Sequence, residues 1–289
     1  MDMLTSLRAP DTTLSFEFFP PKDEDSADAL FKTVHELNQF HPSYVSVTYG
    51  AGGTTRERTR AVVQRIIREA QIPTIPHLTC IGHTRDEMTE ILDRYAEDSV
   101  KTILALRGDP PRDQPNYDRS KDEFKFASDL VRFIKEHPHP FNVGVAGFPE
   151  GHPATLNRLT EMDYFKEKVD AGADYICTQL FFDNHDFLDY RDRCALVGIK
   201  IPVVAGIMPI TTHSSMKRMA ELAAGSHFPA ALLRVLGAAG GERLVVRQAG
   251  IDYATRQCRE LIDEGVAGLH LYTLNKSGAT KEIVKNLSV

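Results

Sequence analysis

Short strand-like runs alternate with helix-like segments along the whole chain of 289 residues. Runs rich in β-branched and aromatic residues are expected to form eight strands, at residues 14–19, 44–50, 74–80, 101–108, 141–148, 174–182, 202–209 and 267–275. Amphipathic segments such as "ADALFKTVHELNQF" and "YATRQCRELIDEG" lie between them and are expected to be helices. Eight strands separated by helices predict one closed (β/α)8 TIM barrel.

Two further expectations concern the organisation of the chain. The stretch from His213 to Arg247 is longer than one helix needs, so an extra helix or loop excursion is expected before the last strand. The composition has no break and the chain ends at Val289, soon after the last helix, so residues 1–289 are expected to form a single catalytic domain. A doubly wound open sheet is the alternative fold, and it is weakened because no expected strand is followed by GxGxxG.

Composition narrows the class of protein. The formal net charge of -6 argues against nucleic-acid binding, which normally requires a basic patch. The N-terminal segment has no apolar leader and no segment is long enough to span a membrane, so a soluble cytoplasmic protein is expected. The cysteines form no CxxC pair and are expected to be reduced and structural, at Cys80, Cys177, Cys194 and Cys258.

Most of the expected strands end in polar residues, at the barrel face that carries active sites in this architecture. These residues are Glu17, Thr48, His77, Thr79, Arg107, Asp109, Gln179, Tyr272, Asn275 and Lys276. Because side chains alternate along a strand, Ser15 and Glu17 share one face, whereas Phe16 and Phe18 share the other with Leu14. The apolar face is expected to meet the helices, which directs Glu17 into the barrel mouth.

Glu17 stands in "SFEFFPP", between phenylalanines and ahead of two prolines. A dry environment favours the neutral form of a carboxylic acid. An acid that stays protonated near neutral pH can donate a proton to a leaving group. The alternative is a structural glutamate that pairs with a cation such as Arg107, and the local sequence leaves both interpretations open.

Other motifs are less specific. In "ALRGDPP", Arg107 and Asp109 could form an ion pair or could hold a polar heterocycle, with Gly108 allowing close approach of the backbone. The HxH pair at 137–139 precedes a strand, which places it on the N-terminal face, so no metal site is expected. A Schiff-base aldolase needs a lysine at a strand end, and only Lys276 comes near.

A set of motifs in fixed order resembles a known family. The motifs are "FEFFPPK", "VSVTYGAGG", "PHLTC", "ALRGD", "GFPEGHP", "KVDAGADYICTQLFFD", "GIMPI" and "LYTLN". Together they resemble 5,10-methylenetetrahydrofolate reductase of the bacterial single-domain type, without the regulatory domain of animal members. The resemblance implies a barrel that binds FAD and reduces 5,10-methylenetetrahydrofolate to 5-methyltetrahydrofolate with NADH or NADPH. It also implies two alternating half-reactions, a role in methionine synthesis and a homo-oligomeric assembly.

The resemblance also implies roles for single residues. Glu17 matches the general acid, and Asp109 matches an aspartate near the flavin and the folate. Positions that match contacts of FAD are Thr48, Tyr49, His77, Arg107, Gly108, Asp109, Ala127, Phe148, His152 and Lys168. Positions that match substrate contacts are Gln179, Met219 and Lys276, and Gln179 also matches a contact of the nicotinamide nucleotide.

The chain departs from the family pattern at several positions. Phe148 stands where a tyrosine is common, Met219 where an aromatic residue can cover the substrate, and Lys276 where arginine is frequent. Gly52 and Gly53 replace bulkier residues and are expected to loosen their loop. The alternatives that remain are another barrel enzyme, such as a metal-dependent hydrolase or an aldolase, and a non-catalytic flavin- or folate-binding protein.

Overall fold

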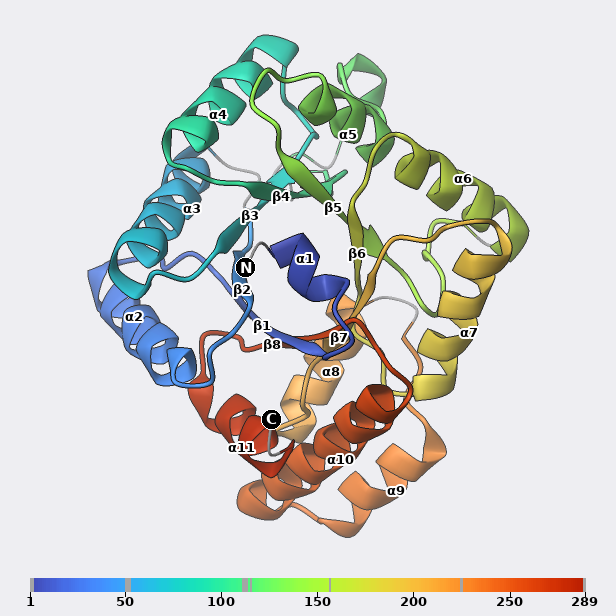
Figure 1. The fold of residues 1–289 in the computed structure, drawn as a ribbon. Coiled ribbons are helices and arrows are strands. Elements are labelled where there is room, and N and C mark those ends of the chain that lie inside the picture. The colour runs from blue at the N-terminus through green and yellow to red at the C-terminus, as the bar shows by residue number, and fades with distance from the viewer. Residues whose placement is uncertain are drawn as a thin grey trace.

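Eight parallel strands close into a barrel in the order of the chain (Figure 1). The computed structural model describes residues 3–49, 53–110, 114, 116–155, 157–223 and 226–287. The strands are β1 (Thr13–Phe18), β2 (Tyr44–Val47), β3 (Thr74–Thr79), β4 (Thr102–Leu106), β5 (Asn142–Gly147), β6 (Tyr175–Thr178), β7 (Val203–Ile207) and β8 (Gly268–Tyr272). β8 pairs with β1, which closes the barrel. The predicted TIM barrel is confirmed, and the doubly wound open sheet is excluded.

Helices surround the barrel and follow the strands in alternation (Figure 1). They are α2 (Glu24–Asn38), α3 (Gly53–Arg65), α4 (Arg85–Glu97), α5 (Ala127–Lys135), α6 (Arg158–Asp170), α7 (Asn184–Leu196) and α11 (Ser277–Leu287). A π-helical turn, η1 (Ile66–Ala70), extends α3, and a short 3-10 turn, η2 (Arg119–Lys121), precedes α5. None of the described helices is both long and apolar enough to cross a membrane.

The excursion predicted before the last strand is confirmed. After β7 the chain forms α8 (His213–Leu222), α9 (Ala230–Ala238) and the long α10 (Arg243–Asp263). These helices enclose an apolar cluster of their own, which contains Met208 from the end of β7 and Leu232 from α9. The excursion is therefore a packed unit attached to the barrel.

Capping boxes determine where two helices begin after their strands. The Asp23 side chain accepts from the backbone N–H of Ser26, and the Ser26 hydroxyl accepts from the N–H of Asp23. Thr84 and Glu87 exchange the same pair of bonds at the start of α4. A cap of this kind stabilises a helix by about 1 kcal/mol. The caps also fix the length of the loops that leave β1 and β3.

The short helix α1 (Met3–Leu7) closes one end of the barrel (Figure 1). Its buried residues Met3, Leu4 and Leu7 pack into a cluster with Tyr44 and Tyr175 in the barrel interior. The two tyrosines are the first residues of β2 and β6, so α1 covers the N-terminal end of the strands. The opposite end, where the strands finish, is the face that carries active sites in this architecture.

The alternation predicted along β1 is confirmed. Phe16 and Phe18 are fully buried in the main cluster between strands and helices. Burying a phenylalanine side chain contributes about 1.5–3 kcal/mol. Ser15 lies on the other face, where its hydroxyl contacts His270 of β8, and Glu17 lies on that face too. The HxH pair lies between α5 and β5 as predicted, and His137 pairs there with Asp93 at 3.1 Å.

Candidate active site

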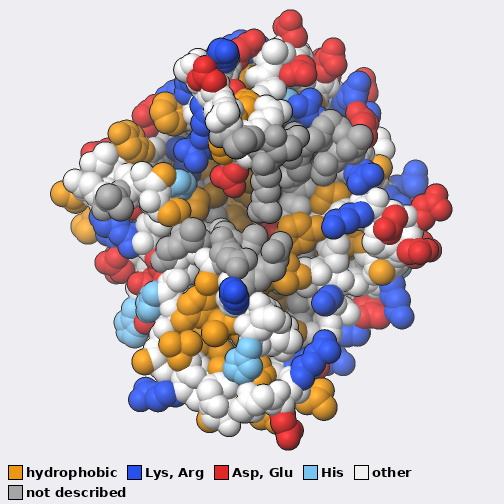
Figure 2. Space-filling view, turned by 180° about the vertical axis from the view of Figure 1, so that it is seen from behind, with side chains coloured by type: hydrophobic (Ala, Val, Ile, Leu, Met, Phe, Trp, Pro, Cys, Tyr) orange, Lys and Arg blue, Asp and Glu red, His pale blue; other side chains and the backbone are white. Residues whose placement is uncertain are grey.

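The C-terminal ends of the strands surround a mouth that α1 does not cover. Seen from that side, the molecule is hollowed near its centre, with hydrophobic side chains in the hollow and charged side chains of both signs around it (Figure 2). Glu17 and His77 come from the ends of β1 and β3 and are each 7% exposed. The predicted gathering of strand-end polar residues is therefore found, with Glu17 among the most buried of them.

Two histidines flank the carboxylate of Glu17. Its Oε2 atom lies 3.4 Å from Nε2 of His77 and 3.7 Å from Nε2 of His270. Burial lowers the pKa of His77, so this imidazole is uncharged at neutral pH. Within the described part of the chain no salt bridge joins Glu17 to Arg107, which was the structural alternative considered from the sequence.

Beneath Glu17 lies a buried polar network that sequence analysis missed. His270 contacts the hydroxyl of Ser15 through Nδ1 at 2.8 Å and the hydroxyl of Ser46 through Nε2 at 3.1 Å. The β1–β8 register places Ser15 opposite His270, and the β1–β2 register places Glu17 opposite Ser46. The signal in the sequence was the alternation in "LHLY", which puts His270 on the same face as Tyr272.

The end of β1 is tied to the segment after β8. The hydroxyl of Thr273 donates to the carbonyl oxygen of Glu17 at 2.6 Å. The side-chain amide of Asn275 accepts from the N–H of Phe19 at 2.8 Å and donates to its carbonyl oxygen at 2.9 Å. Asn275 has a left-handed backbone with φ 57°, a conformation that asparagine tolerates. These bonds hold the backbone around Glu17 and leave Lys276 exposed at the rim.

The turn after β4 brings a cation and a glycine to the mouth. Arg107 is partly buried, and no hydrogen bond or salt bridge engages its guanidinium among the described residues. Burial and the nearby Arg119 lower the pKa of Arg107. Gly108 has φ +83°, and a Cβ there would lie 2.6 Å from Cγ2 of Ile81. Asp109 follows and is exposed.

Two further predicted cofactor contacts are His152 and Lys168. His152 is partly buried, and its pKa is lowered by burial and next by Arg107. Lys168, on α6, donates to the carbonyl oxygen of Ala146 at 2.5 Å, and burial lowers its pKa to about 8. Phe148 packs edge-on against His152 with ring centroids 4.7 Å apart. His152 thus lies within electrostatic reach of both Arg107 and Lys168, and the cofactor contacts of all three remain a prediction.

The remaining residues predicted to bind a cofactor lie after β2 and at the start of α5. The carbonyl oxygen of Thr48 accepts from Thr59 at 3.0 Å. The hydroxyl of Tyr49 contacts Nε2 of His83 at 3.2 Å, so this side chain is directed toward the loop after β3. Ala127 is the first residue of α5 and is partly buried. Gly52 lies outside the described residues, and Gly53 begins α3.

The residues predicted to contact the substrate differ in accessibility. The side-chain oxygen of Gln179 accepts from the N–H of Leu180 at 2.8 Å, at the end of β6. Met219 is 1% exposed and packs within the apolar cluster of the α8–α10 excursion. Its burial gives no support for a contact with the substrate, so the assignment of Met219 remains a prediction.

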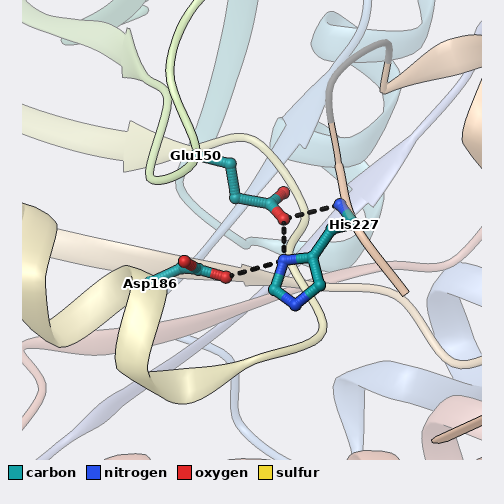
Figure 3. A group of neighbouring side chains, drawn as sticks. All are labelled: Glu150, Asp186 and His227. Carbon is teal, nitrogen blue, oxygen red and sulfur yellow. Dashed lines mark hydrogen bonds and ion pairs between the residues drawn. The ribbon is translucent and has the colours of Figure 1, made fainter. Parts of the chain in front are cut away.

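A second acidic group lies at the rim and ties the excursion to the mouth (Figure 3). His227, between α8 and α9, directs Nδ1 toward Oε1 of Glu150 at 2.9 Å and toward Oδ2 of Asp186 at 3.1 Å. Its backbone N–H also donates to Glu150 at 2.6 Å. Burial and the neighbouring Glu150 raise the pKa of Asp186. Glu150 follows β5 and Asp186 lies in the first turn of α7, so the group joins two loops and the start of a helix.

Comparison with known proteins identifies the family. The family model described as "Methylenetetrahydrofolate reductase" matches residues 3–288. The chain is 34% identical over 276 residues to the 5,10-methylenetetrahydrofolate reductase of Escherichia coli, covering 96% of this chain and 90% of the relative. It is 36% identical over 288 residues to methylenetetrahydrofolate reductase (NADH) 1 of Arabidopsis thaliana. That match covers 96% of this chain and 48% of the plant protein, so the chain spans about half its length.

Solved structures support the fold. A Clostridium thermocellum protein described as binding two copies of 5-methyl-5,6,7,8-tetrahydrofolic acid superposes with a TM-score of 0.64 at 13% identity, over 99% of this chain and 98% of that one. A dihydropteroate synthase from Xanthomonas albilineans superposes with a TM-score of 0.54 at 15% identity, over 96% and 92%. These likenesses concern the fold alone. From the family model and the bacterial relatives, the chain belongs to the methylenetetrahydrofolate reductase family.

Proposed function

We propose that this protein reduces 5,10-methylenetetrahydrofolate to 5-methyltetrahydrofolate, with electrons from NADH or NADPH passed through bound FAD in two alternating half-reactions. The single observation that carries the proposal is the buried acid Glu17 at the mouth of a barrel of this family. A carrier that only binds folate or flavin has no need of such an acid. A reductase needs it, because the folate ring opens only when its leaving nitrogen is protonated.

The residues at the mouth fit FAD in their chemistry. Nε2 of His77 and Oγ1 of Thr79 are buried without a hydrogen-bond partner among the described residues, which suits groups that meet a polar ligand. Arg107 and Lys168 would hold the pyrophosphate through charge-assisted hydrogen bonds, and His152 would add a neutral N–H donor. Gly108 allows the backbone to approach a flat ring closely. FAD would supply hydride transfer between the two substrates.

The chain's own residues then manage position and protons. Glu17 would donate its proton to the folate nitrogen that leaves. The buried setting excludes water that would otherwise compete as a proton source. Asp109 would place a negative charge near the flavin and near a cationic folate intermediate, favouring the cation. Gln179, at the end of β6, would orient the folate and the nicotinamide in turn.

The test is anaerobic and needs the purified protein with FAD. We expect NADH or NADPH to bleach the flavin absorbance and methylenetetrahydrofolate to restore it, with parallel lines in steady-state kinetics. Menadione serves as the control acceptor, because it reoxidises flavin without the folate step. Protein that binds no FAD would overturn the proposal. Flavin that is reduced and then reoxidised by menadione but not by methylenetetrahydrofolate would indicate a different substrate.

The cellular setting is also proposed. All four cysteines are buried and free, which suits a reducing cytoplasm. We propose a homo-oligomer with a role in methionine synthesis, and sedimentation analysis at several protein concentrations tests the assembly. A single monomeric species at every concentration would contradict it.

A further inference from the structure

His270 lies one layer below Glu17 in the barrel interior and is 1% exposed. Ser15 holds its Nδ1 atom at 2.8 Å and Ser46 holds its Nε2 atom at 3.1 Å. The ring of Tyr44 stacks on the imidazole with centroids 5.7 Å apart and an interplanar angle of 16°. The imidazole is therefore held at both nitrogens and on one face, so its orientation is fixed by the barrel.

The proton of the Ser15 hydroxyl decides which nitrogen of His270 carries a proton. Ser15 Oγ lies 3.1 Å from the carbonyl oxygen of Leu269 as well as 2.8 Å from Nδ1 of His270. A hydroxyl has one proton to donate, and a carbonyl oxygen can only accept. Both contacts are hydrogen bonds only if Ser15 donates to Leu269 and accepts from N–H at Nδ1. The opposite assignment leaves two acceptors facing each other in a buried site, which costs about 1–3 kcal/mol.

We propose that His270 is a positioning residue for Glu17, held by Ser15 in the Nδ1–H tautomer so that Nε2, the ring nitrogen nearer to the acid, carries no proton. Glu17 lies 3.7 Å from that nitrogen. This distance is too long for a direct hydrogen bond, but an unprotonated nitrogen there repels a carboxylate more than it repels a neutral acid. The arrangement therefore favours the protonated form of Glu17, which the reductase reaction uses. Ser46 lies 3.1 Å from Nε2 and donates its hydroxyl proton there, which keeps this nitrogen an acceptor.

The other titratable groups around this pair do not compete for the proton. Burial raises the pKa of Tyr44, of Cys177 and of Tyr272 well above neutrality, so all three stay uncharged. His77 lies on the other side of Oε2, and burial lowers its pKa. These four groups thus offer Glu17 no full positive charge.

The tautomer is measured directly, without any cofactor or substrate. The purified chain carrying ¹⁵N-labelled histidine is examined by long-range ¹H–¹⁵N NMR at neutral pH, and the His270 signals are assigned by their loss in His270→Asn. We expect a neutral ring protonated at Nδ1, and a change toward the Nε2–H form in Ser15→Ala. A ring protonated at Nε2, or doubly protonated, in the unaltered chain would overturn the proposal.

The consequence for catalysis rests on the proposed function. It is tested with asparagine and glutamine at position 270, whose amide groups imitate one or the other ring nitrogen of histidine. Asparagine at 270 retains a donor near the Nδ1 position, whereas glutamine can place an acceptor near the Nε2 position. We expect His270→Asn to slow flavin reoxidation by methylenetetrahydrofolate about tenfold or more, with the fall in rate at high pH beginning at lower pH. His270→Gln is expected to recover most of this rate. Equal losses in the two variants, or an unshifted pH profile, would mean that His270 is merely structural.

A control variant distinguishes the effect of losing any buried hydroxyl from the effect of changing the tautomer of His270. Thr255→Val removes a buried hydroxyl in α10 that bonds only within its helix, to the carbonyl oxygen of Ile251 at 2.8 Å. It should leave the pH profile of the folate half-reaction unchanged, whereas Ser15→Ala should shift it. If the chain fails to bind FAD, the proposed function fails while the NMR result still decides the tautomer. If both half-reactions run but the tautomer is wrong, this inference fails alone.

Discussion

Replacing Glu17 with glutamine removes one exchangeable acid proton and leaves the size of the side chain nearly unchanged. The glutamine amide can still reach Nε2 of His77 and of His270, which lie 3.4 and 3.7 Å from the carboxylate in the native chain. Loss of a buried carboxyl is offset by loss of its desolvation cost, so the free energy of unfolding should change by no more than about 1 kcal/mol. The substitution therefore separates chemistry from folding.

The expected magnitude follows from the burial of this side chain. General acid catalysis contributes about 10²–10⁴ in rate, or about 3–5 kcal/mol of barrier. The Glu17 side chain is 9% exposed, which leaves little room for water to replace the acid. We therefore expect the folate half-reaction to slow by about 10³-fold. Flavin reduction by the nicotinamide needs no protonated folate, so its rate should change less than about threefold.

The assay is anaerobic stopped-flow absorbance of the flavin, with each half-reaction followed alone. Glu282→Gln serves as a matched control. Glu282 lies on α11, away from the mouth, and its Oε1 atom is 2.6 Å from Nη2 of Arg247. Thermal unfolding of all three proteins checks that the fold is retained. Equal losses in both half-reactions would refute the reasoning, as would a folate half-reaction slowed less than about tenfold.

Four further predictions concern the rim and the loops. Asp109→Asn should raise the flavin midpoint potential and weaken folate turnover, and an unchanged potential in spectroelectrochemical titration would show that its charge is screened. Gly108→Ala should destabilise the fold by about 1–3 kcal/mol in urea, because φ is +83° and the new Cβ would lie 2.6 Å from Ile81. The pKa of His83 is lowered from 6.5 to about 4 by burial, so the unfolded chain binds the extra proton and stability rises with pH between these values. His83→Gln should flatten that rise by up to about 3 kcal/mol, and identical urea curves at pH 7 and 4.5 for both proteins would contradict it. Burial lowers the pKa of Lys168 to about 8, so FAD affinity should fall as pH rises through this value, and Lys168→Met should bind FAD more weakly with no such slope in fluorescence titrations.

The fold and the direction of Glu17 could be predicted because both depend on short-range patterns. Alternating hydrophobicity in "LSFEFF" puts Phe16 and Phe18 against the helices, and both are fully buried there. The repeat of strands and helices then leaves few topologies other than a barrel. The same alternation correctly put Ser15 in the interior, although its partner was not foreseen.

The histidine network could not be predicted, because it exists only through closure of the barrel. Ser15 meets His270 across the β1–β8 pair, 255 positions away in the chain. A lone histidine in an apolar strand carries no sign of which residue it will face. Met219 is a different case, because its burial among the apolar side chains of the excursion depends on how α8–α10 pack, which its motif does not encode. Its contact with the substrate remains a prediction.

The seam between β1 and β8 is held by side-chain hydrogen bonds in addition to the backbone hydrogen bonds of the sheet. Thr12, Thr13 and Ser15 each donate a side-chain hydrogen bond to a backbone carbonyl of the last strand or the residues before it, at 3.0–3.1 Å. Thr273 returns one to the carbonyl oxygen of Glu17 at 2.6 Å. β1 and β8 are the strand pair with the most residues between them, so pairing them costs the most chain entropy in the barrel. We therefore expect the strands to separate first at this pair. Opening there would admit water to Glu17, and hydration stabilises the carboxylate over the acid. The side-chain bonds that keep the barrel closed therefore also keep water away from Glu17, which couples the stability of this seam to the site at its upper end.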